Sequence, residues 1–299
     1  MAPAAASYVL VTPMKNESDM LDGLFASVLS QTTLPILWIL VDDSSSDESL
    51  QKARDLASSY PWIQVVSAGL EPTPVWLRYG AVVSTGIEKA LERTGTQGQI
   101  IDVIGVLDAD TIVDSAYFEK LSTRLVEIKG AIASGMIDAP GQGYGYPSQA
   151  LPRGCGRLYR LSFLREVGGF PVTPAPDTVL EIKARNRGFT LVIDSGSTGT
   201  HRRGSSLFRD PVGHRNLGYA HYSLGTDLTS FLLVSISLLL RCGTQEAVAF
   251  AEGYFGGRKQ KQPRIDDPEI REYFSSSLKR LVVSKDTKAV IKTLLRAAD

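Results

Sequence analysis

The stretch Ile101–Asp110, with the sequence IDVIGVLDAD, joins an apolar run directly to two carboxylates. Val103–Leu107 has the length and the aliphatic composition of a strand that is buried on both faces. Asp108 and Asp110 are therefore expected at the carboxyl end of a strand, where open α/β sheets bind their ligands. Two like charges at this spacing favour a divalent cation between them, although a DxD pattern by itself is also common in turns.

Similar apolar runs precede this strand, and helical patterns separate them. The earlier runs are Tyr8–Val11, Ile36–Val41 and Ile63–Val66. The helical patterns follow Ser18 as far as Leu29, cover Glu48–Tyr60, and extend from about Gly80 to Arg93. Strands that alternate with helices predict a parallel sheet covered by helices. We therefore expect an α/β fold with a mostly parallel, Rossmann-like sheet flanked by helices.

A second pair of carboxylates, Asp42 and Asp43, ends the run LWILVDD. The residues that follow, Ser44–Asp47, have the composition of an Asx turn and a helix N-cap. Such a turn needs no further acidic residue at the end of the strand. Because both carboxylate pairs would lie at the same edge of one sheet, the sequence predicts a crevice lined with acidic side chains.

The composition argues against several classes of partner and cofactor. Lys and Arg together number 32, as do Asp and Glu, so the chain has no net positive field for a nucleic acid. Cys155 and Cys242 lack the spacing of a structural zinc site or of a disulfide framework. Met1–Tyr8 lacks the basic start and the apolar core of a signal peptide. We therefore expect no nucleic-acid partner and a cytoplasmic location.

The segment Asp138–Gly156 changes composition to Gly, Pro, Gln and Tyr. Such a segment is typical either of a solvated loop or of a substrate loop. In a substrate loop, the aromatic rings of Tyr144 and Tyr146 would stack on a ring of the substrate.

Beyond this segment, a helix is expected over Asp177–Arg187 and a strand over Thr190–Ile193, which a Gly/Ser/Thr loop connects to His201. Asp177 follows Pro174-Ala175-Pro176, a position where an aspartate commonly caps a helix. The sequence His201-Arg202-Arg203, taken by itself, is typical of a solvated basic turn.

The most apolar run is Leu228–Leu240 (LTSFLLVSISLLL), which ends at Arg241. It is shorter than the ~20 residues that span a bilayer, and it is too apolar to be left in water. It can be buried in the protein's own core, in a contact with a second subunit, or in the headgroup region at the inner face of a membrane. The last helical pattern of the chain covers Val282–Leu295.

Five short motifs resemble, in their order along the chain, the family 2 glycosyltransferases, which are inverting nucleotide-sugar enzymes with a GT-A fold. The motifs are TPMKNE at Thr12–Glu17, VDDSSSD at Val41–Asp47, DAD at Asp108–Asp110, GGF at Gly168–Phe170, and DTVLEIKARNRGF at Asp177–Phe189. The resemblance implies a GT-A domain over residues 1–215. It leaves residues 216–299 as a helical C-terminal region.

The resemblance also implies a nucleotide site. The residues that it assigns to this site are Thr12, Pro13, Glu17, Asp42, Asp43, Arg78 and Asp108. Thr12 and Pro13 would cradle the nucleotide in a loop after the first strand. Asp43 would accept the imino hydrogen of a uracil-like base, and Arg78 would contact the base or the phosphates.

The remaining implied roles belong to the metal ion, the diphosphate and the acceptor. The resemblance assigns Mg²⁺ or Mn²⁺ to Asp108, Asp110 and His201, and the diphosphate to Arg202 and Arg203. Asp177 would be the general base that deprotonates the acceptor. Such enzymes usually have an acidic pair at this point, but Pro176 precedes Asp177 here, so a lone carboxylate is expected.

The activity implied is metal-dependent transfer of a sugar from a nucleoside-diphosphate sugar, UDP-linked rather than GDP-linked. The acceptor would be a hydroxyl of a saccharide, of a lipid-linked molecule or of another small molecule. A sugar nucleotidyltransferase is an alternative, although TPMKNE lacks the glycines of that class's signature. A non-catalytic module that binds a sugar or a lipid carrier on the same fold is another.

Overall fold

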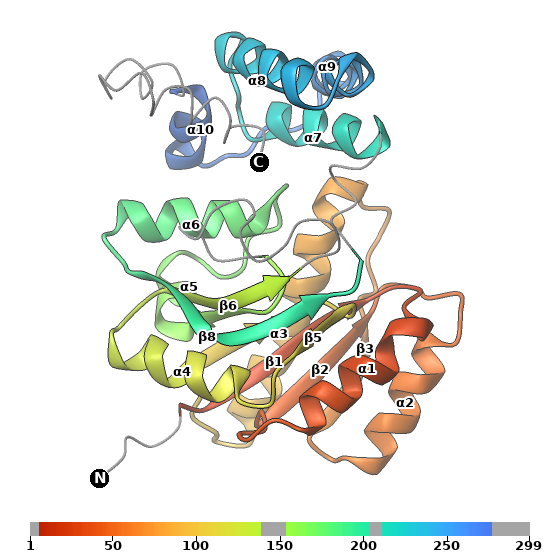
Figure 1. Ribbon diagram of the computed structural model, residues 1–299, viewed down its shortest axis with the longest axis vertical. Helices are drawn as coiled ribbons and strands as arrows, with labels where there is room; N and C mark the ends of the chain where they lie inside the picture. The colour runs from red at the N-terminus through yellow and green to blue at the C-terminus, as the bar shows by residue number, and fades with distance from the viewer. Residues whose placement is uncertain (1–5, 139–153, 204–210, 277–299) are drawn as a thin grey trace. The chain divides into compact units, whose positions relative to one another are not determined.

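The computed structural model describes residues 6–138, 154–203 and 211–276 of the 299-residue chain (Figure 1). Contacts within the chain divide it into two units. The first comprises residues 1–172 and 176–204, and the second comprises residues 173–175 and 205–299. Tyr144, Tyr146 and the helix predicted over Val282–Leu295 lie outside the described residues.

An eight-stranded sheet forms the centre of the first unit. Its strands are β1 (Tyr8–Met14), β2 (Leu37–Asp42), β3 (Ile63–Ser67), β4 (Val103–Val106), β5 (Thr111–Val113), β6 (Ile132–Asp138), β7 (Arg157–Arg160) and β8 (Leu191–His201). The order across the sheet is β3-β2-β1-β4-β7-β6-β8-β5. The first four strands in this order are parallel, β7 is antiparallel to both its neighbours, and β8 is parallel to β6 but antiparallel to β5. The predicted α/β fold with a mostly parallel sheet is confirmed.

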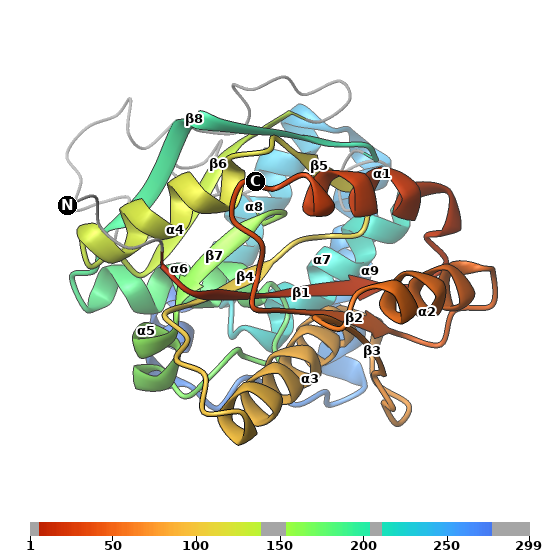
Figure 2. The ribbon, with the colours of Figure 1, turned by 90° about the horizontal axis from the view of Figure 1, so that it is seen from below.

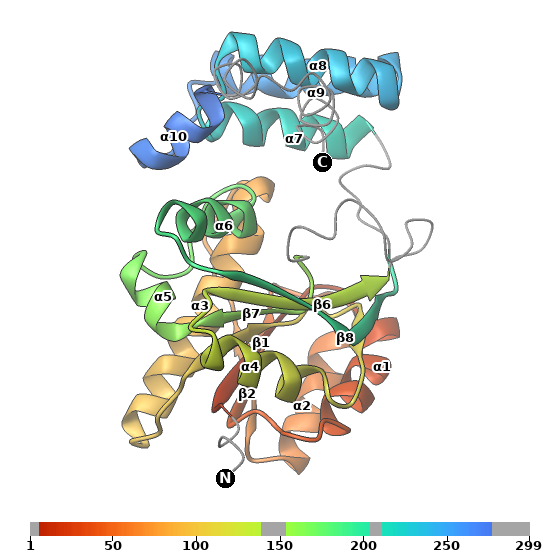
Figure 3. The ribbon, with the colours of Figure 1, turned by 60° about the vertical axis from the view of Figure 1, so that its left-hand side comes forward.

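Helices cover both faces of this sheet. They are α1 (Ser18–Leu29), α2 (Ser49–Ser59), α3 (Val75–Thr96), α4 (Tyr117–Glu127), α5 (Leu161–Glu166) and α6 (Pro176–Asn186). One apolar cluster holds α1, α2 and α4 on one face, and a second holds α3, α5 and α6 on the other; Figures 2 and 3 show α4 and α3 on opposite sides. At Gly86, α3 comes so close to the sheet that a Cβ would lie 2.5 Å from Val11 Cγ1.

Three local predictions about these elements were wrong. Thr12 and Pro13 lie within β1 rather than in a loop after it, and α3 begins at Val75 rather than near Gly80. The Gly/Ser/Thr segment before His201 is the second half of β8 and not a loop. Its composition has low strand propensity, but β6 on one side and β5 on the other supply partners for its backbone hydrogen bonds.

The second unit is helical over its described residues. Its helices are α7 (Pro211–Ser223), α8 (Leu228–Arg241), α9 (Thr244–Lys259) and α10 (Pro268–Ser275). A separate apolar cluster forms its core, from Tyr222, Phe231, Val234, Leu238, Phe250 and Tyr254. The boundary predicted at residue 215 lies within α7, whereas the contacts divide the chain close to residue 204.

Helix α8 has one buried apolar face and one exposed apolar face. Phe231, Val234 and Leu238 are buried in the core of the second unit. The exposed side chains are Leu228, Leu232, Ile236, Leu239 and Leu240, which are 47–80% accessible. Burial in the protein's own core therefore accounts for one side of this run only. No helix in the described part of the chain is both long enough and apolar enough to cross a membrane.

Candidate active site

The loops after β1 and β2 lie side by side at the carboxyl edge of the sheet. The backbone N–H of Asn16 donates to Ser45 Oγ (3.1 Å), and the N–H of Ser46 donates to Asn16 Oδ1 (2.7 Å). Asn16 and Ser44 have φ values of 55° and 60°, a left-handed backbone that is costly for residues other than glycine. These hydrogen bonds hold both loops in that conformation and fix the edge on which the acidic residues lie.

Asp42 and Asp43 contact different partners. The Asp42 carboxylate accepts a hydrogen bond from the backbone N–H of Ser45 (3.2 Å) and so stabilises the turn. Asp43 accepts from Arg78 through both oxygens, with Nε at 2.5 Å and Nη2 at 2.6 Å, and Lys15 Nζ lies 3.5 Å away. Such a bidentate pair is geometrically specific. The structure therefore brings together two residues that the sequence assigned to the nucleotide separately.

The side chain of Thr12 faces the core and not the crevice. It is fully buried, and its Oγ1 accepts a hydrogen bond from Trp38 Nε1 (3.0 Å). Pro13, the next residue of β1, is half-buried. The Thr12 hydroxyl thus accepts its hydrogen bond inside the core. If this end of β1 contacts a nucleotide, the contact is made by the backbone or by Pro13.

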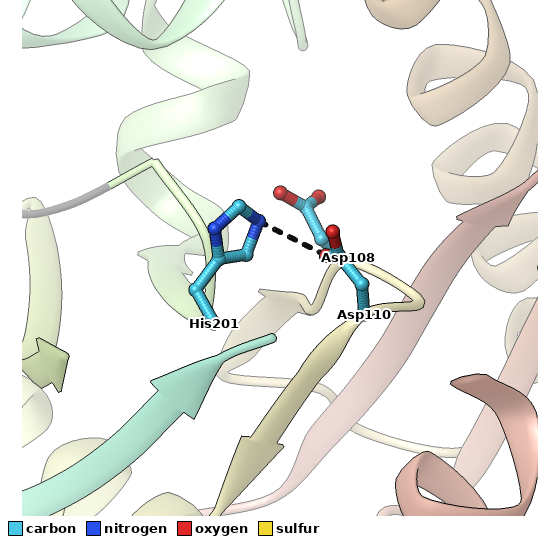
Figure 4. Close-up of side chains that lie close together, drawn as sticks. All are labelled: Asp108, Asp110 and His201. Atoms are coloured by element: carbon cyan, nitrogen blue, oxygen red, sulfur yellow. Dashed lines mark ion pairs between the residues drawn. The ribbon is translucent and has the colours of Figure 1, made fainter. Parts of the chain in front are cut away.

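Asp108, Asp110 and His201 come together because of the register of β5 and β8. Thr111 lies opposite His201 in this antiparallel pair. His201 consequently meets the residue before Thr111, and its Nε2 lies 3.0 Å from Asp110 Oδ1. Asp108 completes a group whose ligand atoms all lie within 4.8 Å of one another (Figure 4). Two carboxylates and an imidazole are a donor set that suits a divalent metal ion.

The environment of Asp108 disfavours its negative charge. Burial, the charge of Asp110 and the charge of Asp177 raise the pKa of Asp108 to about 6. The Tyr79 hydroxyl donates to Asp108 Oδ1 (3.0 Å) and partly offsets this effect. A nearby cation would stabilise the ionised carboxylate directly. Both the donor set and its electrostatics therefore fit Mg²⁺ or Mn²⁺.

Arg202 and Arg203 point to different partners. Arg203 forms ion pairs with Glu17 and with Asp110, the latter with Nε 3.7 Å from Oδ2. Arg202 directs its side chain to the backbone carbonyl of Asp19 on α1, with Nη1 at 3.5 Å. The geometry therefore places Arg203 beside the candidate metal ligands and Arg202 against α1.

Asp177 lies in the first turn of α6, beside β7. Its Oδ1 accepts a hydrogen bond from the Tyr159 hydroxyl (2.7 Å), and its backbone carbonyl accepts one from Arg157 Nη1 (3.3 Å). Arg157 and Tyr159 are two residues apart on a strand and therefore share a face. Because Arg157 pairs with Val106, the start of β7 lies at the end of β4 that leads to Asp108.

A second carboxylate, Glu181, lies one helical turn after Asp177. Its Oε1 is 2.7 Å from Arg157 Nη2, and its side chain is 9% exposed. Residues four apart in a helix share a face, so Glu181 lies on the same side of α6 as Asp177, while Pro176 occupies the position directly before Asp177. Burial raises the pKa of Glu181, and the charge of Arg157 opposes that rise.

Sequence reasoning missed four residues that contact the candidate site: Tyr79, Arg157, Tyr159 and Glu181. Two signals were available for part of this set. The alternation in RLYR at Arg157–Arg160 puts Arg157 and Tyr159 on one face, and the four-residue step from Asp177 points to Glu181. No local signal pairs Tyr79 with Asp108, since α3 and the end of β4 meet only in the folded sheet.

A family model for glycosyl transferase family 2 matches residues 9–173. This match covers more than half of the 299 residues, so the chain belongs to glycosyl transferase family 2. The resemblance inferred from the five motifs is confirmed. The match ends before Asp177 and His201, so the roles of these two residues rest on geometry and motif resemblance. No curated protein sequence matches the chain.

Solved glycosyltransferase structures share the fold. The chain is similar to the mannosyltransferase PcManGT from Pyrobaculum calidifontis in complex with GDP-Man and Mn²⁺, with 13% identity, a TM-score of 0.56, and coverage of 99% of this chain and 86% of that one. It is also similar to S. aureus TarS 1-349 in complex with UDP-GlcNAc, with 15% identity, a TM-score of 0.55, and coverage of 98% and 90%. At these identities the likeness shows the fold, which is GT-A as predicted.

Proposed function

We propose that the protein is a metal-dependent, inverting glycosyltransferase of the hexosyltransferase type that uses a UDP-linked sugar. The observation that carries this proposal is the grouping of Asp108, Asp110 and His201 within 4.8 Å, with Asp177 close enough to raise the pKa of Asp108. A cation site beside a carboxylate offers charge stabilisation and proton removal in one place. Membership of family 2 supports sugar transfer as the class of reaction.

The leaving group of such a reaction is a nucleoside diphosphate, on which negative charge grows as the bond to the sugar breaks. Asp108, Asp110 and His201 would hold Mg²⁺ or Mn²⁺, which when bound supplies Lewis-acid stabilisation of that charge. Arg203, beside Asp110, would add a fixed positive charge for the phosphates. Arg202 is less suited to binding the phosphates, because its side chain contacts α1.

Asp43 and Arg78 would bind the base as a pair. A carboxylate accepts the imino hydrogen of uracil, and a guanidinium donates to a neighbouring carbonyl oxygen. Both oxygens of Asp43 accept from Arg78 in this structure, so the base would replace one of these hydrogen bonds. Asp42 would support Asp43 by keeping the Ser45 turn in place, and Glu17 would hold Arg203 beside the phosphates.

Asp177 would take the proton from the acceptor hydroxyl. One positioned carboxylate is sufficient for direct displacement by that hydroxyl, which inverts the anomeric carbon. The acceptor would be a saccharide, a lipid-linked molecule or another small alcohol. We place this reaction in the cytoplasm, either free or at the inner face of a membrane.

The alternatives differ in what they consume. A sugar nucleotidyltransferase would release pyrophosphate from a nucleoside triphosphate and a sugar phosphate. A non-catalytic module would bind its ligand and turn nothing over. Release of UDP from a UDP-sugar, with no consumption of UTP, therefore separates the proposed transferase from both.

Donor and metal can be tested by thermal shift. UDP with Mn²⁺ at about a hundred times the dissociation constant should raise the melting temperature by roughly 5–10 °C, because the ligand binds only the folded state. UDP with EDTA, or Mn²⁺ alone, should have a much smaller effect. A shift with GDP as large as that with UDP would refute the assignment of the base, and no dependence on Mn²⁺ or Mg²⁺ would refute the metal site.

We also propose that the exposed face of α8 is a contact surface, either for a second copy of the chain or for an anionic membrane. Leu232→Glu combined with Ile236→Glu changes two side chains that are more than half exposed, so the fold should survive. Light scattering and sedimentation with phosphatidylglycerol vesicles should show that the wild type dimerises or pellets and that the double variant does neither. A monomeric wild type that stays in the supernatant would contradict the proposal.

A further inference from the structure

The Asp177 carboxylate is held through one of its two oxygens. Its Oδ1 accepts the hydrogen bond from the Tyr159 hydroxyl (2.7 Å), and Arg157 Nη1 lies 4.0 Å from the same oxygen. Tyr159 is fully buried, and its ring packs edge-on against Phe170 with the ring centroids 5.7 Å apart. The donor to Asp177 is therefore anchored in the core of the first unit and has little freedom to move.

The direction of this hydrogen bond is fixed by Arg157. The guanidinium of Arg157 also hydrogen-bonds the Tyr159 hydroxyl, and a guanidinium can only donate. The hydroxyl therefore accepts from Arg157 and must give its own proton to Asp177. Glu181, 2.7 Å from Arg157 Nη2, holds the other side of the guanidinium. This chain of contacts presents Asp177 Oδ1 with a hydrogen-bond donor that is itself held in place.

The other oxygen, Oδ2, faces Gly154. A Cβ at Gly154 would lie 2.8 Å from Asp177 Oδ2 and 3.9 Å from its Cγ. Apart from Gly154 and its two chain neighbours, only the Asp177 carboxylate supplies described atoms within 4 Å of that position. A side chain at residue 154 would therefore crowd Oδ2, the oxygen that Tyr159 does not bind.

We propose that Tyr159 is a positioning residue that binds Asp177 Oδ1, so that Oδ2 is the oxygen that receives the acceptor proton, and that Gly154 keeps Oδ2 accessible. Arg157 and Glu181 set the direction of the Tyr159 hydrogen bond. This inference rests on the proposed role of Asp177 as general base. It adds which oxygen acts and which residues select it.

The ¹³C chemical shift of the Asp177 carboxyl carbon provides a direct test that needs no turnover. In protein labelled with ¹³C at the aspartate carboxyl carbons, the Asp177 signal is the one that is lost in Asp177→Asn. Tyr159→Phe keeps the ring and removes the donor to Oδ1, so it should shift the Asp177 signal at constant pH and lower kcat without changing the affinity for UDP. The groups that also act on Asp177 are Arg157, Glu181, Tyr79 and Asp108, and they are unchanged in this variant.

Two further variants complete the experiment. Tyr8→Phe removes another largely buried hydroxyl, one that donates to the carbonyl of Thr33 (2.7 Å), and should leave the Asp177 signal at its wild-type position. Gly154→Ala tests the second oxygen without changing the core. Its methyl group should crowd Oδ2 and slow UDP release from UDP-glucose about tenfold with unchanged UDP affinity.

The outcomes separate this inference from the function on which it rests. An unchanged Asp177 signal in Tyr159→Phe would overturn the positioning role, whatever the activity of the protein. Wild-type UDP release by Gly154→Ala would overturn the assignment of Oδ2. Wild-type UDP release by Asp177→Asn would instead overturn the general-base function, while a shifted Asp177 signal in Tyr159→Phe would still establish the hydrogen bond.

Discussion

Asp177→Asn is expected to lower turnover by roughly 10²–10⁴-fold while nucleotide binding stays at the wild-type level. Asparagine has nearly the same shape, and its carbonyl oxygen can still accept the hydrogen bond from the Tyr159 hydroxyl. It cannot take a proton from an acceptor at neutral pH. The measurement is UDP release from UDP-glucose with Mn²⁺, with water or an added saccharide as acceptor, alongside calorimetric titration with UDP.

The matched control is Asp55→Asn, which makes the same chemical change at an exposed residue of α2. Its turnover should equal that of the wild type. If Asp177→Asn also turned over at the wild-type rate, Asp177 would be reduced to a residue that stabilises the start of α6. Loss of UDP affinity in that variant would point instead to a distorted crevice.

The acidic edge of the sheet could be predicted because it depends on local sequence. An apolar run that ends in carboxylates specifies both the strand and the place where it stops, as at Val106 and Asp108 or at Val41 and Asp43. Parallel strands then carry their ends to the same edge, which the register of β1 with β2 and β4 confirms. No knowledge of distant contacts is required for this step.

The direction of individual side chains was less predictable. Thr12 was assigned to the nucleotide, yet alternation along β1 places it on the same face as Leu10 and Met14. Both of these side chains are buried in the apolar cluster on that face of the sheet, and the Thr12 hydroxyl finds Trp38 there. The motif indicated the correct strand end, whereas the two-residue period determined which side chains face the core.

The partners of Asp177 could not be inferred from the motifs, because the contacts depend on the pairing of β7. This short strand is antiparallel to β4 and β6 in an otherwise largely parallel region, and nothing in four residues specifies that pairing. Once β7 lies beside β4, Arg157 and Tyr159 meet α6. The order of the strands in the sheet, and not the sequence of α6, therefore determines which side chains surround the proposed base Asp177.

Asp110→Ala should weaken Mn²⁺ binding by at least about 10²-fold. Loss of a residue that only supports a metal ligand already lowers metal affinity by about 10–100-fold, and Asp110 is a candidate ligand itself. Asp110 contacts His201 Nε2 at 3.0 Å and is one of the two carboxylates of the cluster. Its removal also relieves the repulsion that raises the pKa of Asp108, so the fold should be retained. Calorimetry with Mn²⁺, with and without UDP, measures the loss.

Asp22→Ala is the control for this change, since Asp22 is an exposed carboxylate that pairs with Lys52 on the surface. It should bind Mn²⁺ and UDP as the wild type does. An Asp110→Ala protein with unchanged Mn²⁺-dependent affinity for UDP would show that the DxD carboxylates are not metal ligands.

Asp110→Ala and Asp177→Asn should fail at different steps, although both residues act on the pKa of Asp108 or its surroundings. The first should lose Mn²⁺-dependent nucleotide binding, and with it any turnover at ordinary donor concentrations. The second should bind UDP and Mn²⁺ normally and fail only in proton removal. Because a general disturbance of the crevice would reduce binding in both variants alike, normal binding in one and loss of it in the other would establish two separate functions at one edge of the sheet.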